Sequence, residues 1–455
     1  MKEKIVILGS GESGVGAAIL AMKNHYDVFI SDLGIISSNT KQKLDELGVA
    51  FEEKKHTFEL IKKADTVVKS PGIPDNTPLI MDLIAQGVVV ISEIEFAFRH
   101  IAPNAKIIGI TGTNGKTTTA LLTYHLLKEA GLDVALAGNI GYSLSKRVSE
   151  KDYDFYVIEI SSFQLDGIIQ FKPDISVLLN ITSDHLDRYH HDFKKYVASK
   201  FRIVENVNAG SSFIYCPDSS AVNEEVNERD ITASLFAISA NPHSKKGAFI
   251  GKDHLIFNFE YHEKDRISLA DIPLIGRHNM INAMSSALCA LMLEIPIKKV
   301  LEGMKSFKNV PHRLEMVAEI DQVKFINDSK ATNVDAVYYA LEGIKEPIIW
   351  IAGGIDKGND YSILDQCVAQ KVKGIVCLGI DNSKIENHFS GKVPFMGRAR
   401  SIREAIQSVW EIASAGDVVL LSPACASFDL FTNYEDRGDQ FKKAVGSLNL
   451  KSTSL

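Results

Sequence analysis

The sequence has few cysteines, no long apolar run and no excess of basic residues. Its 5 cysteines among 455 residues are widely spaced and form no C-x-x-C pair, which argues against a disulfide framework and against a zinc site. No apolar stretch approaches the length of a membrane span, and residues 4–8 already predict a strand, so we expect neither a membrane segment nor a signal peptide. A net charge of −7, with mixed signs, argues against a nucleic-acid-binding surface. We therefore expect a cytoplasmic enzyme.

The length and composition are those of a globular protein with several domains. Hydrophobic residues make up 45% and charged residues 24% of the chain. A chain of 455 residues is too long to fold around a single hydrophobic core. We predict three α/β domains: residues 1–100 with a Rossmann-like pattern, residues 101–308 around a P-loop, and residues 309–455 with a doubly wound Rossmann-like pattern.

The stretch 110–118, ITGTNGKTT, predicts a phosphate-binding loop. An apolar strand over 105–110 precedes it, and helical periodicity over 119–129 follows it. A glycine loop between a strand and a helix directs backbone N–H groups, the positive helix end and Lys116 at one place, which suits the phosphates of ATP, and the Thr117 hydroxyl would contact magnesium. The strict motif has glycine where this chain has Ile110, so a plain glycine turn stays an alternative.

The N-terminal segment carries a G-x-G-x-x-G turn, Gly9 to Gly14, between a strand and a helix. A second strand over 27–31 ends at Asp32. This fingerprint is typical of dinucleotide sites, but the same geometry holds other diphosphates, including that of a UDP-sugar. A further strand over 66–69 meets the turn 70–74, which is either a ligand-binding turn at a strand end or a plain turn.

Polar residues end the strands of the middle segment. Glu159 follows an apolar strand and is well placed beside a P-loop strand to hold magnesium. His185, between Asp184 and Asp187, is a candidate ligand or a surface residue. Lys200 lies on the apolar stripe of a helix capped by Asp192, and on sequence alone snorkelling into solvent is favoured over a functional lysine.

Two further groups of polar residues complete the pattern. Asn279 and Asn282 project from one side of a helix and suit adenine, although a helix N-cap would explain one of them. In the C-terminal segment, strands over 324–327, 347–352, 374–378 and 418–421 are predicted, and polar clusters follow three of them at 327–333, 353–358 and 422–429. A rim of cations and hydroxyls suited to a small dicarboxylate comes from Lys330, Thr332, Lys357 and Ser427. The segment 211–270 yields only one β stretch, at 255–259.

These motifs, in this order, resemble the Mur ligase family over nearly the whole chain. The resemblance rests on GTNGKT at 112–117, Glu159 with SSFQL at 161–165, DHLD at 184–187, GRHNMIN at 276–282, His312-Arg313 and the two C-terminal clusters. It implies a monomeric ATP-dependent ligase of peptidoglycan precursor synthesis, which adds D-glutamate to UDP-N-acetylmuramoyl-L-alanine through an acyl phosphate. A loop shortened in this way is expected for the family.

The resemblance also implies roles for individual residues. The phosphates of ATP would lie on Gly112, Thr113, Asn114, Gly115, Lys116, Thr117 and Thr118, and the rest of ATP on Asn279, Asn282, Arg313 and Asp328. Two magnesium ions would be held by Thr117, Glu159, His185 and a carbamylated Lys200. The UDP-sugar would contact Ser13, Asp32, Gly72 and Asn139, and D-glutamate would contact Lys330, Thr332, Lys357, Ser427 and Phe428.

Three other functions compete with this interpretation. A nucleotide-dependent oxidoreductase would use the N-terminal fingerprint but leaves the P-loop and Glu159 without a role. A P-loop switch or transport protein has no use for the lysine-rich C-terminal clusters. Another ligase of the same family, or a folylpolyglutamate synthase, is the nearest alternative, although the latter has no reason to carry a UDP-binding segment.

Overall fold

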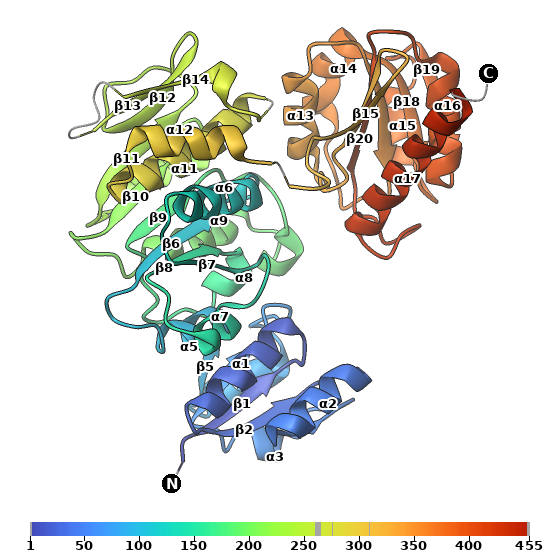
Figure 1. The fold of residues 1–455 in the computed structure, drawn as a ribbon. Coiled ribbons are helices and arrows are strands. Elements are labelled where there is room, and N and C mark those ends of the chain that lie inside the picture. The colour runs from blue at the N-terminus through green and yellow to red at the C-terminus, as the bar shows by residue number, and fades with distance from the viewer. Residues whose placement is uncertain (1, 260–264, 275, 309, 453–455) are drawn as a thin grey trace. The chain divides into compact units, whose positions relative to one another are not determined.

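The computed structural model describes residues 2–259, 265–274, 276–308 and 310–452, whose strands form three sheets (Figure 1). The chain folds into two compact units. One contains Met1–Ile272 and Ile281–Ser306, and the other contains Pro273–Met280 and Phe307–Leu455. The first two sheets belong to the first unit and the third sheet to the second.

The first sheet has five parallel strands in the order β3-β2-β1-β4-β5. The predicted strands near the N-terminus are confirmed. The turn after β1 needs its glycines: Gly9 has φ +96°, and a Cβ on Gly14 would lie 2.0 Å from the Gly9 carbonyl oxygen. The elements are β1 (Lys4–Leu8), α1 (Glu12–Lys23), β2 (Asp27–Ser31), α2 (Ser38–Leu47), β3 (Ala50–Glu52), α3 (Phe58–Ile61), β4 (Thr66–Lys69), α4 (Pro78–Ala85), β5 (Val89–Ser92) and α5 (Glu93–Phe98).

The second sheet has nine strands in the order β14-β13-β12-β11-β10-β9-β6-β8-β7. The P-loop strand β6 lies between β8 and β9 and runs parallel to both, so the polar residues that follow all three strands gather at one edge. The elements up to the end of α9 are β6 (Lys106–Thr111), α6 (Lys116–Glu129), β7 (Val134–Gly138), α7 (Leu144–Glu150), β8 (Phe155–Glu159), α8 (Ser162–Leu165), β9 (Ile175–Leu178), the 3₁₀ turn Leu186–Tyr189 and α9 (Phe193–Phe201).

The segment 211–270 is far more regular than its sequence indicated. It extends the second sheet by five strands: β10 (Ser212–Tyr215), β11 (Ser234–Ser239), β12 (Gly247–Ile250), β13 (His254–Asn258) and β14 (Arg266–Ser268), with α10 (Ser220–Glu228) between the first two. The β stretch predicted at 255–259 is confirmed as β13. The other four strands were not predicted, because they are short and draw their stability from neighbouring strands and not from a local pattern. The helices α11 (Arg277–Met292) and α12 (Ile297–Ser306) follow.

The third sheet has six strands in the order β15-β16-β20-β17-β18-β19, and all four strands predicted here are confirmed. Its last strand in sequence, β20, lies between β16 and β17 and runs parallel to both. The elements are β15 (Glu315–Ile320), β16 (Val323–Asn327), α13 (Val334–Gly343), β17 (Ile348–Gly353), α14 (Asp365–Lys371), β18 (Val372–Leu378), α15 (Ser383–Phe389), β19 (Phe395–Ala399), α16 (Ile402–Ile412), β20 (Val418–Ala424) and α17 (Tyr434–Ser452).

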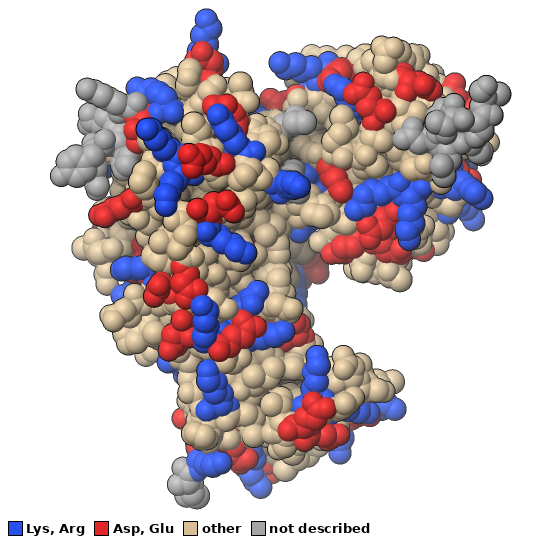
Figure 2. Space-filling view, in the orientation of Figure 1, with Lys and Arg blue, Asp and Glu red and all other residues tan. Residues whose placement is uncertain are grey.

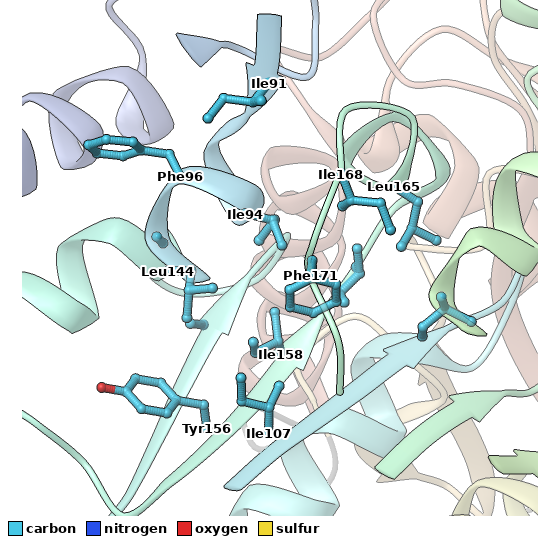
Figure 3. Packing of buried hydrophobic residues seen from close by; sticks show 14 of the residues in the cluster. Ile91, Ile94, Phe96, Ile107, Leu144, Tyr156, Ile158, Leu165, Ile168 and Phe171 are labelled. Carbon is cyan, nitrogen blue, oxygen red and sulfur yellow. The ribbon is translucent and has the colours of Figure 1, made fainter. Parts of the chain in front are cut away.

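The first two sheets share one hydrophobic core. Ile94 and Phe96 of α5 belong to the same buried cluster as Ile158 of β8 and Phe171. Figure 3 shows Ile94, Ile158 and Phe171 close together, whereas the Phe96 ring points away from them. Beside this cluster the buried Glu95 carboxylate accepts hydrogen bonds of 2.9 Å from three successive backbone N–H groups at residues 169–171. This shared packing explains why both sheets belong to one compact unit.

The structure shows where the cysteines lie, how apolar the helices are and how the surface charges are distributed. All five cysteines are buried and none forms a disulfide. None of the helices within the described residues has a stretch long and apolar enough to cross a membrane. On the face drawn in Figure 2, acidic and basic side chains are interspersed, without a continuous basic surface.

Candidate active site

The loop between β6 and α6 has the predicted strand-loop-helix arrangement and is held in shape by Asn180. The Asn180 side chain accepts from the Asn114 N–H at 2.8 Å and donates to the Asn114 carbonyl at 3.1 Å, and the Asn180 carbonyl accepts from the Thr113 N–H at 2.9 Å. Gly112 and Gly115 have φ +152° and +88°, conformations that favour glycine. Asn180 follows β9, so a neighbouring strand of the sheet braces the loop.

Two lysines converge on the carbonyl of Gly112. Lys116 Nζ donates to the carbonyl oxygens of Gly112 and Thr113 at 2.8 Å each, and Lys200 Nζ donates to the same Gly112 oxygen at 2.9 Å. Lys200 is 1% exposed and its ammonium nitrogen also lies 4.7 Å from the centre of the Tyr196 ring. The snorkelling interpretation of Lys200 is therefore wrong: the side chain extends into the P-loop and not into solvent.

The environment of Lys200 favours its neutral form. Burial lowers the pKa of Lys200 well below its ordinary value, and the neighbouring positive charge of Lys116 lowers it further. The carboxylates of Asp184, Asp166 and Glu159 act in the opposite direction but do not prevail. A neutral lysine amine is a nucleophile, whereas an ammonium group is not.

Glu159 ends β8 with its carboxylate buried beside the P-loop strand. One oxygen, Oε1, accepts from the Asn139 side-chain amide at 2.9 Å, and the Asn139 N–H donates to the Glu159 carbonyl at 2.8 Å. The other oxygen, Oε2, is buried and has no hydrogen-bond partner in the described part of the chain. A buried carboxylate oxygen without a donor is costly, so this atom fits a bound cation. Asn139, expected to contact the sugar, is also placed to orient Glu159.

The His185 side chain, which follows Asp184, is 46% exposed. Its ring packs against Phe163, with ring centres 5.2 Å apart, and Nε2 lies 3.7 Å from an Asp184 carboxylate oxygen. Its backbone has φ +53°, in the left-handed region. As predicted, Asp192 caps α9 through a hydrogen bond of 2.9 Å from the Lys194 N–H. Among the described residues no three His, Cys, Asp or Glu side chains are grouped as a metal site.

The two asparagines of α11 are both buried. Asn282 lies against the P-loop: a Cβ on Gly115 would come within 2.4 Å of the Asn282 side-chain oxygen. The absence of a side chain at Gly115 thus permits this close approach. Asn279 lies one turn earlier on α11. It belongs to the second compact unit, as do Arg313 and Asp328.

The predicted sugar-binding residues lie at the carboxyl ends of first-sheet strands. Asp32 Oδ2 accepts from both the N–H and the hydroxyl of Ser10 at 2.6 Å, and Oδ1 accepts from the Gly34 N–H at 2.7 Å. Burial acts to raise the pKa of Asp32, but these hydrogen bonds outweigh it and lower the pKa. Ser13 is half-buried in the first turn of α1.

The turn that contains Gly72 is joined to the middle segment by Arg188. This side chain donates to the Gly72 and Pro71 carbonyls at 2.9 and 3.0 Å. Its guanidinium carbon lies over the Phe163 ring, 4.3 Å from the ring centre. No sequence pattern indicated this contact, because it joins positions more than 100 residues apart. It brings the turn after β4 and the segment that contains His185 together within the first unit.

In the second unit the three polar clusters meet, as their positions after β16, β17 and β20 predict. Ile355 and Ala426 exchange backbone hydrogen bonds of 2.9 and 3.1 Å, and the Ala424 N–H donates to the Ala331 carbonyl at 3.0 Å. Asp328 is buried and accepts from the Ser422 hydroxyl at 2.8 Å. Burial raises the pKa of Asp328 to about 7, although Ser422 and Arg313 act against the rise.

The residues predicted to bind the amino acid differ widely in exposure. Ser427 is buried, Lys330 and Thr332 are half-buried, Lys357 is exposed, and the Phe428 ring is 70% exposed although it is large and apolar. An exposed aromatic ring beside a group of polar loops is available to cover a bound molecule. Lys330 Nζ lies 5.3 Å from the centre of the Tyr434 ring of α17, a helix to which the sequence pattern assigned no role.

Family models match three consecutive stretches of the chain. The MurD N-terminal domain matches residues 4–79, the Mur ligase middle domain residues 110–290, and the Mur ligase glutamate ligase domain residues 312–425. A UDP-N-acetylmuramoylalanine–D-glutamate ligase of Christiangramia forsetii is 48% identical over 450 residues, which cover 98% of this chain and 100% of that protein.

Solved structures share the fold at low sequence identity. MurF of Acinetobacter baumannii has a TM-score of 0.63 at 13% identity and covers 97% of this chain and 93% of its own. MurF ligase of Thermotoga maritima, solved in complex with ADP, has a TM-score of 0.60 at 16% identity and covers 92% of this chain and 95% of its own. These likenesses confirm the predicted α/β fold with three domains.

Proposed function

Because this chain belongs to the Mur ligase family, a family of ATP-dependent amide-bond-forming ligases, we propose that it joins D-glutamate to UDP-N-acetylmuramoyl-L-alanine. A relative that is named as a ligase for these two substrates is 48% identical to this chain, over 98% of this chain and 100% of that protein. The product is a precursor of peptidoglycan.

One observation within the site carries the proposal: a P-loop with Lys116 stands beside a buried carboxylate, Glu159, which has an oxygen without a hydrogen-bond partner in the described residues. Phosphoryl transfer needs a positioned positive charge and a metal cation to neutralise the phosphates. Lys116 would supply the charge, and the free oxygen of Glu159 would hold the cation. An oxidoreductase would leave this arrangement without use.

The residues present fit magnesium. Thr117 in the first turn of α6, Glu159 at the end of β8, and His185 and Lys200 in the segment after β9 would hold it. Bound there, magnesium would neutralise charge on the phosphates of ATP. The unpartnered Oε2 of Glu159 supports this assignment, because a hard oxygen ligand is what magnesium prefers.

The chain's own residues would carry the reaction in two stages. The N–H groups of Gly112–Thr118 and the Lys116 ammonium would stabilise the γ-phosphoryl group while the alanyl carboxylate attacks it, giving an acyl phosphate and ADP. The D-glutamate amine would then attack the acyl carbon and release phosphate, forming the amide. Asn279, Asn282, Arg313 and Asp328 would hold the remainder of ATP.

The substrates would be divided among the three segments. Residues 1–100 would bind the UDP-sugar through Ser13, Asp32 and Gly72, residues 101–308 would bind ATP and present Asn139 to the sugar, and residues 309–455 would bind D-glutamate. Lys330, Thr332, Lys357, Ser427 and Phe428 are the proposed contacts with the amino acid. The two carboxylates of glutamate match the cations and hydroxyls of these loops.

Phosphate release from ATP tests the function directly. We expect release only when UDP-N-acetylmuramoyl-L-alanine and D-glutamate are both present, because the acyl phosphate needs an amine acceptor. L-lysine and meso-diaminopimelate serve as controls, and equal turnover with either would overturn the assignment of the amino acid.

We further propose that Lys200 is carbamylated and that its carbamate ligates magnesium. Its neutral Nζ would add to carbon dioxide, forming an N–C bond and releasing a proton, and the product offers oxygen in place of a repelling cation. Lys200→Ala should lose about 10²-fold in kcat while remaining folded, and reversible removal of dissolved carbon dioxide should slow the wild-type enzyme. An unmodified amine found by native mass spectrometry in the active enzyme would exclude the carbamate.

A further inference from the structure

Arg437, in the first turn of α17, is the second largest of the fully buried side chains in the described residues, at 1% exposure. Arginine is rarely buried without a carboxylate partner, because removing its charge from water is costly. Within the ranges that the structure describes, its guanidinium group donates to a serine hydroxyl and to backbone carbonyls and to no carboxylate. The side chain therefore has a buried charge that the mechanism described above does not use.

The hydrogen bonds of Arg437 go to two loops. Nε donates to the Ser329 hydroxyl at 2.9 Å and Nη2 to the Ser329 carbonyl at 2.8 Å. Nη1 and Nη2 both donate to the Cys425 carbonyl at 3.3 Å. Ser329 follows β16 and Cys425 follows β20, so one planar guanidinium group ties together the ends of two adjacent strands.

These are the loops that we propose to bind the amino acid. Ser329 precedes Lys330, and Cys425 lies two residues before Ser427. The Ser329 hydroxyl also donates to the Tyr434 carbonyl at 2.8 Å, which joins the same loop to the start of α17. A shift of Arg437 would therefore move both loops together.

The buried charge of Arg437 also makes the region of the Ser329 and Cys425 loops more attractive to anions. Burial lowers the pKa of Arg437 to about 10, which still leaves the guanidinium protonated at neutral pH. The neighbouring Cys425 and Asp429 groups act to raise the pKa of Arg437, but burial outweighs them. A cation beneath two loops in a water-poor region attracts anionic ligands more strongly than one in solvent.

We propose that Arg437 is a positioning residue for the acidic amino-acid substrate, which holds the Ser329 and Cys425 loops in register and adds positive charge beneath them. This inference rests on the proposed function, because it assigns the two loops to D-glutamate. Arg437 itself does not contact the reacting atoms, and its effect should fall on the affinity for the amino acid and not on phosphoryl transfer.

Steady-state kinetics of the full-length enzyme test the proposal. Arg437→Met should raise KM for D-glutamate by about 10-fold or more, while kcat and KM for ATP change less than about threefold. Arg437→Lys keeps the charge but not the fork of donors, so its KM for D-glutamate should lie between those of the wild type and Arg437→Met. Arg398→Met is the matched control, since Arg398 lies in the same unit with its side chain 81% exposed.

The outcomes separate this inference from the proposed function. If the wild-type enzyme releases no phosphate in response to D-glutamate, the proposed function is wrong. If the wild type is active and KM for D-glutamate is unchanged in Arg437→Met, or rises in parallel with KM for ATP, the positioning role is wrong. Circular dichroism decides the remaining case: should both variants fail to fold, Arg437 is a structural residue of its unit and the proposal is overturned.

Discussion

The P-loop site and the amino-acid loops are built in different ways. Residues 110–118 are contiguous, and their spacing alone brings backbone N–H groups, Lys116 and Thr117 together. The loops of the second unit come from residues 327–333, 353–358 and 422–429, which meet only because β20 lies between β16 and β17. A local motif can thus be read from the chain, whereas an assembled site depends on residues outside it, such as Arg437 and Gly438 of α17.

The largest expected effect concerns the local motif. Lys116→Ala should lower kcat by about 10²-fold or more, because one preorganised charge that stabilises the transferring phosphoryl group is lost. Lys128→Ala, near the exposed end of the same helix, is the control and should leave kcat unchanged. A loss below threefold in Lys116→Ala, measured as phosphate release, would show that the loop does not hold the reacting phosphates.

A second prediction tests whether α17 supports the assembled loops. A Cβ on Gly438 would lie 2.1 Å from His312 Nδ1 and 3.0 Å from the Asn327 side-chain nitrogen, so Gly438→Ala should destabilise the protein by about 1–3 kcal/mol. A Cβ on Gly446 of the same helix would have nothing within 4 Å, so Gly446→Ala should stabilise the helix by about 0.5–1 kcal/mol. Urea unfolding distinguishes the two substitutions, and equal effects would contradict the packing argument.

A further prediction concerns a pH dependence of stability in the assembled loops. The pKa of Asp328 in the folded protein is about 7, above its usual 3.8, so the folded state keeps a proton that the unfolded state loses. Its contribution to stability is present below pH 3.8 and is lost as the pH rises through about 7. Between these values the wild type should lose stability relative to Asp328→Asn by up to about 1.4 kcal/mol per pH unit.

Urea unfolding at several pH values between 4 and 8 measures this difference. The stability of Asp328→Asn should rise relative to the wild type as the pH increases and become level above pH 7. Parallel curves for the two proteins would mean that Asp328 titrates normally, and that its burial beside Ser422 does not govern its charge.

Much of the fold was predictable because local patterns specify it. The strands before the P-loop, around Glu159 and in the C-terminal segment are apolar runs that end in polar residues, and the structure places them as predicted. The segment 211–270 was not predictable, since its short strands are defined by pairing with neighbours at the edge of the second sheet. Arg188 and Asn180 were missed for the same reason, because each acts on a loop distant in sequence.

By itself the sequence determined the phosphate-binding loop, the family resemblance and the order of the α/β segments, because each depends on spacing along one strand-loop-helix unit. Only the tertiary structure decided which group the Lys200 side chain contacts and which loops Arg437 joins. Helical periodicity places Lys200 on an apolar face, but it does not say whether the long side chain reaches water or the Gly112 carbonyl. Likewise, no local pattern reveals that β16 and β20 become neighbours, and this adjacency gives the buried guanidinium of Arg437 two loops to join.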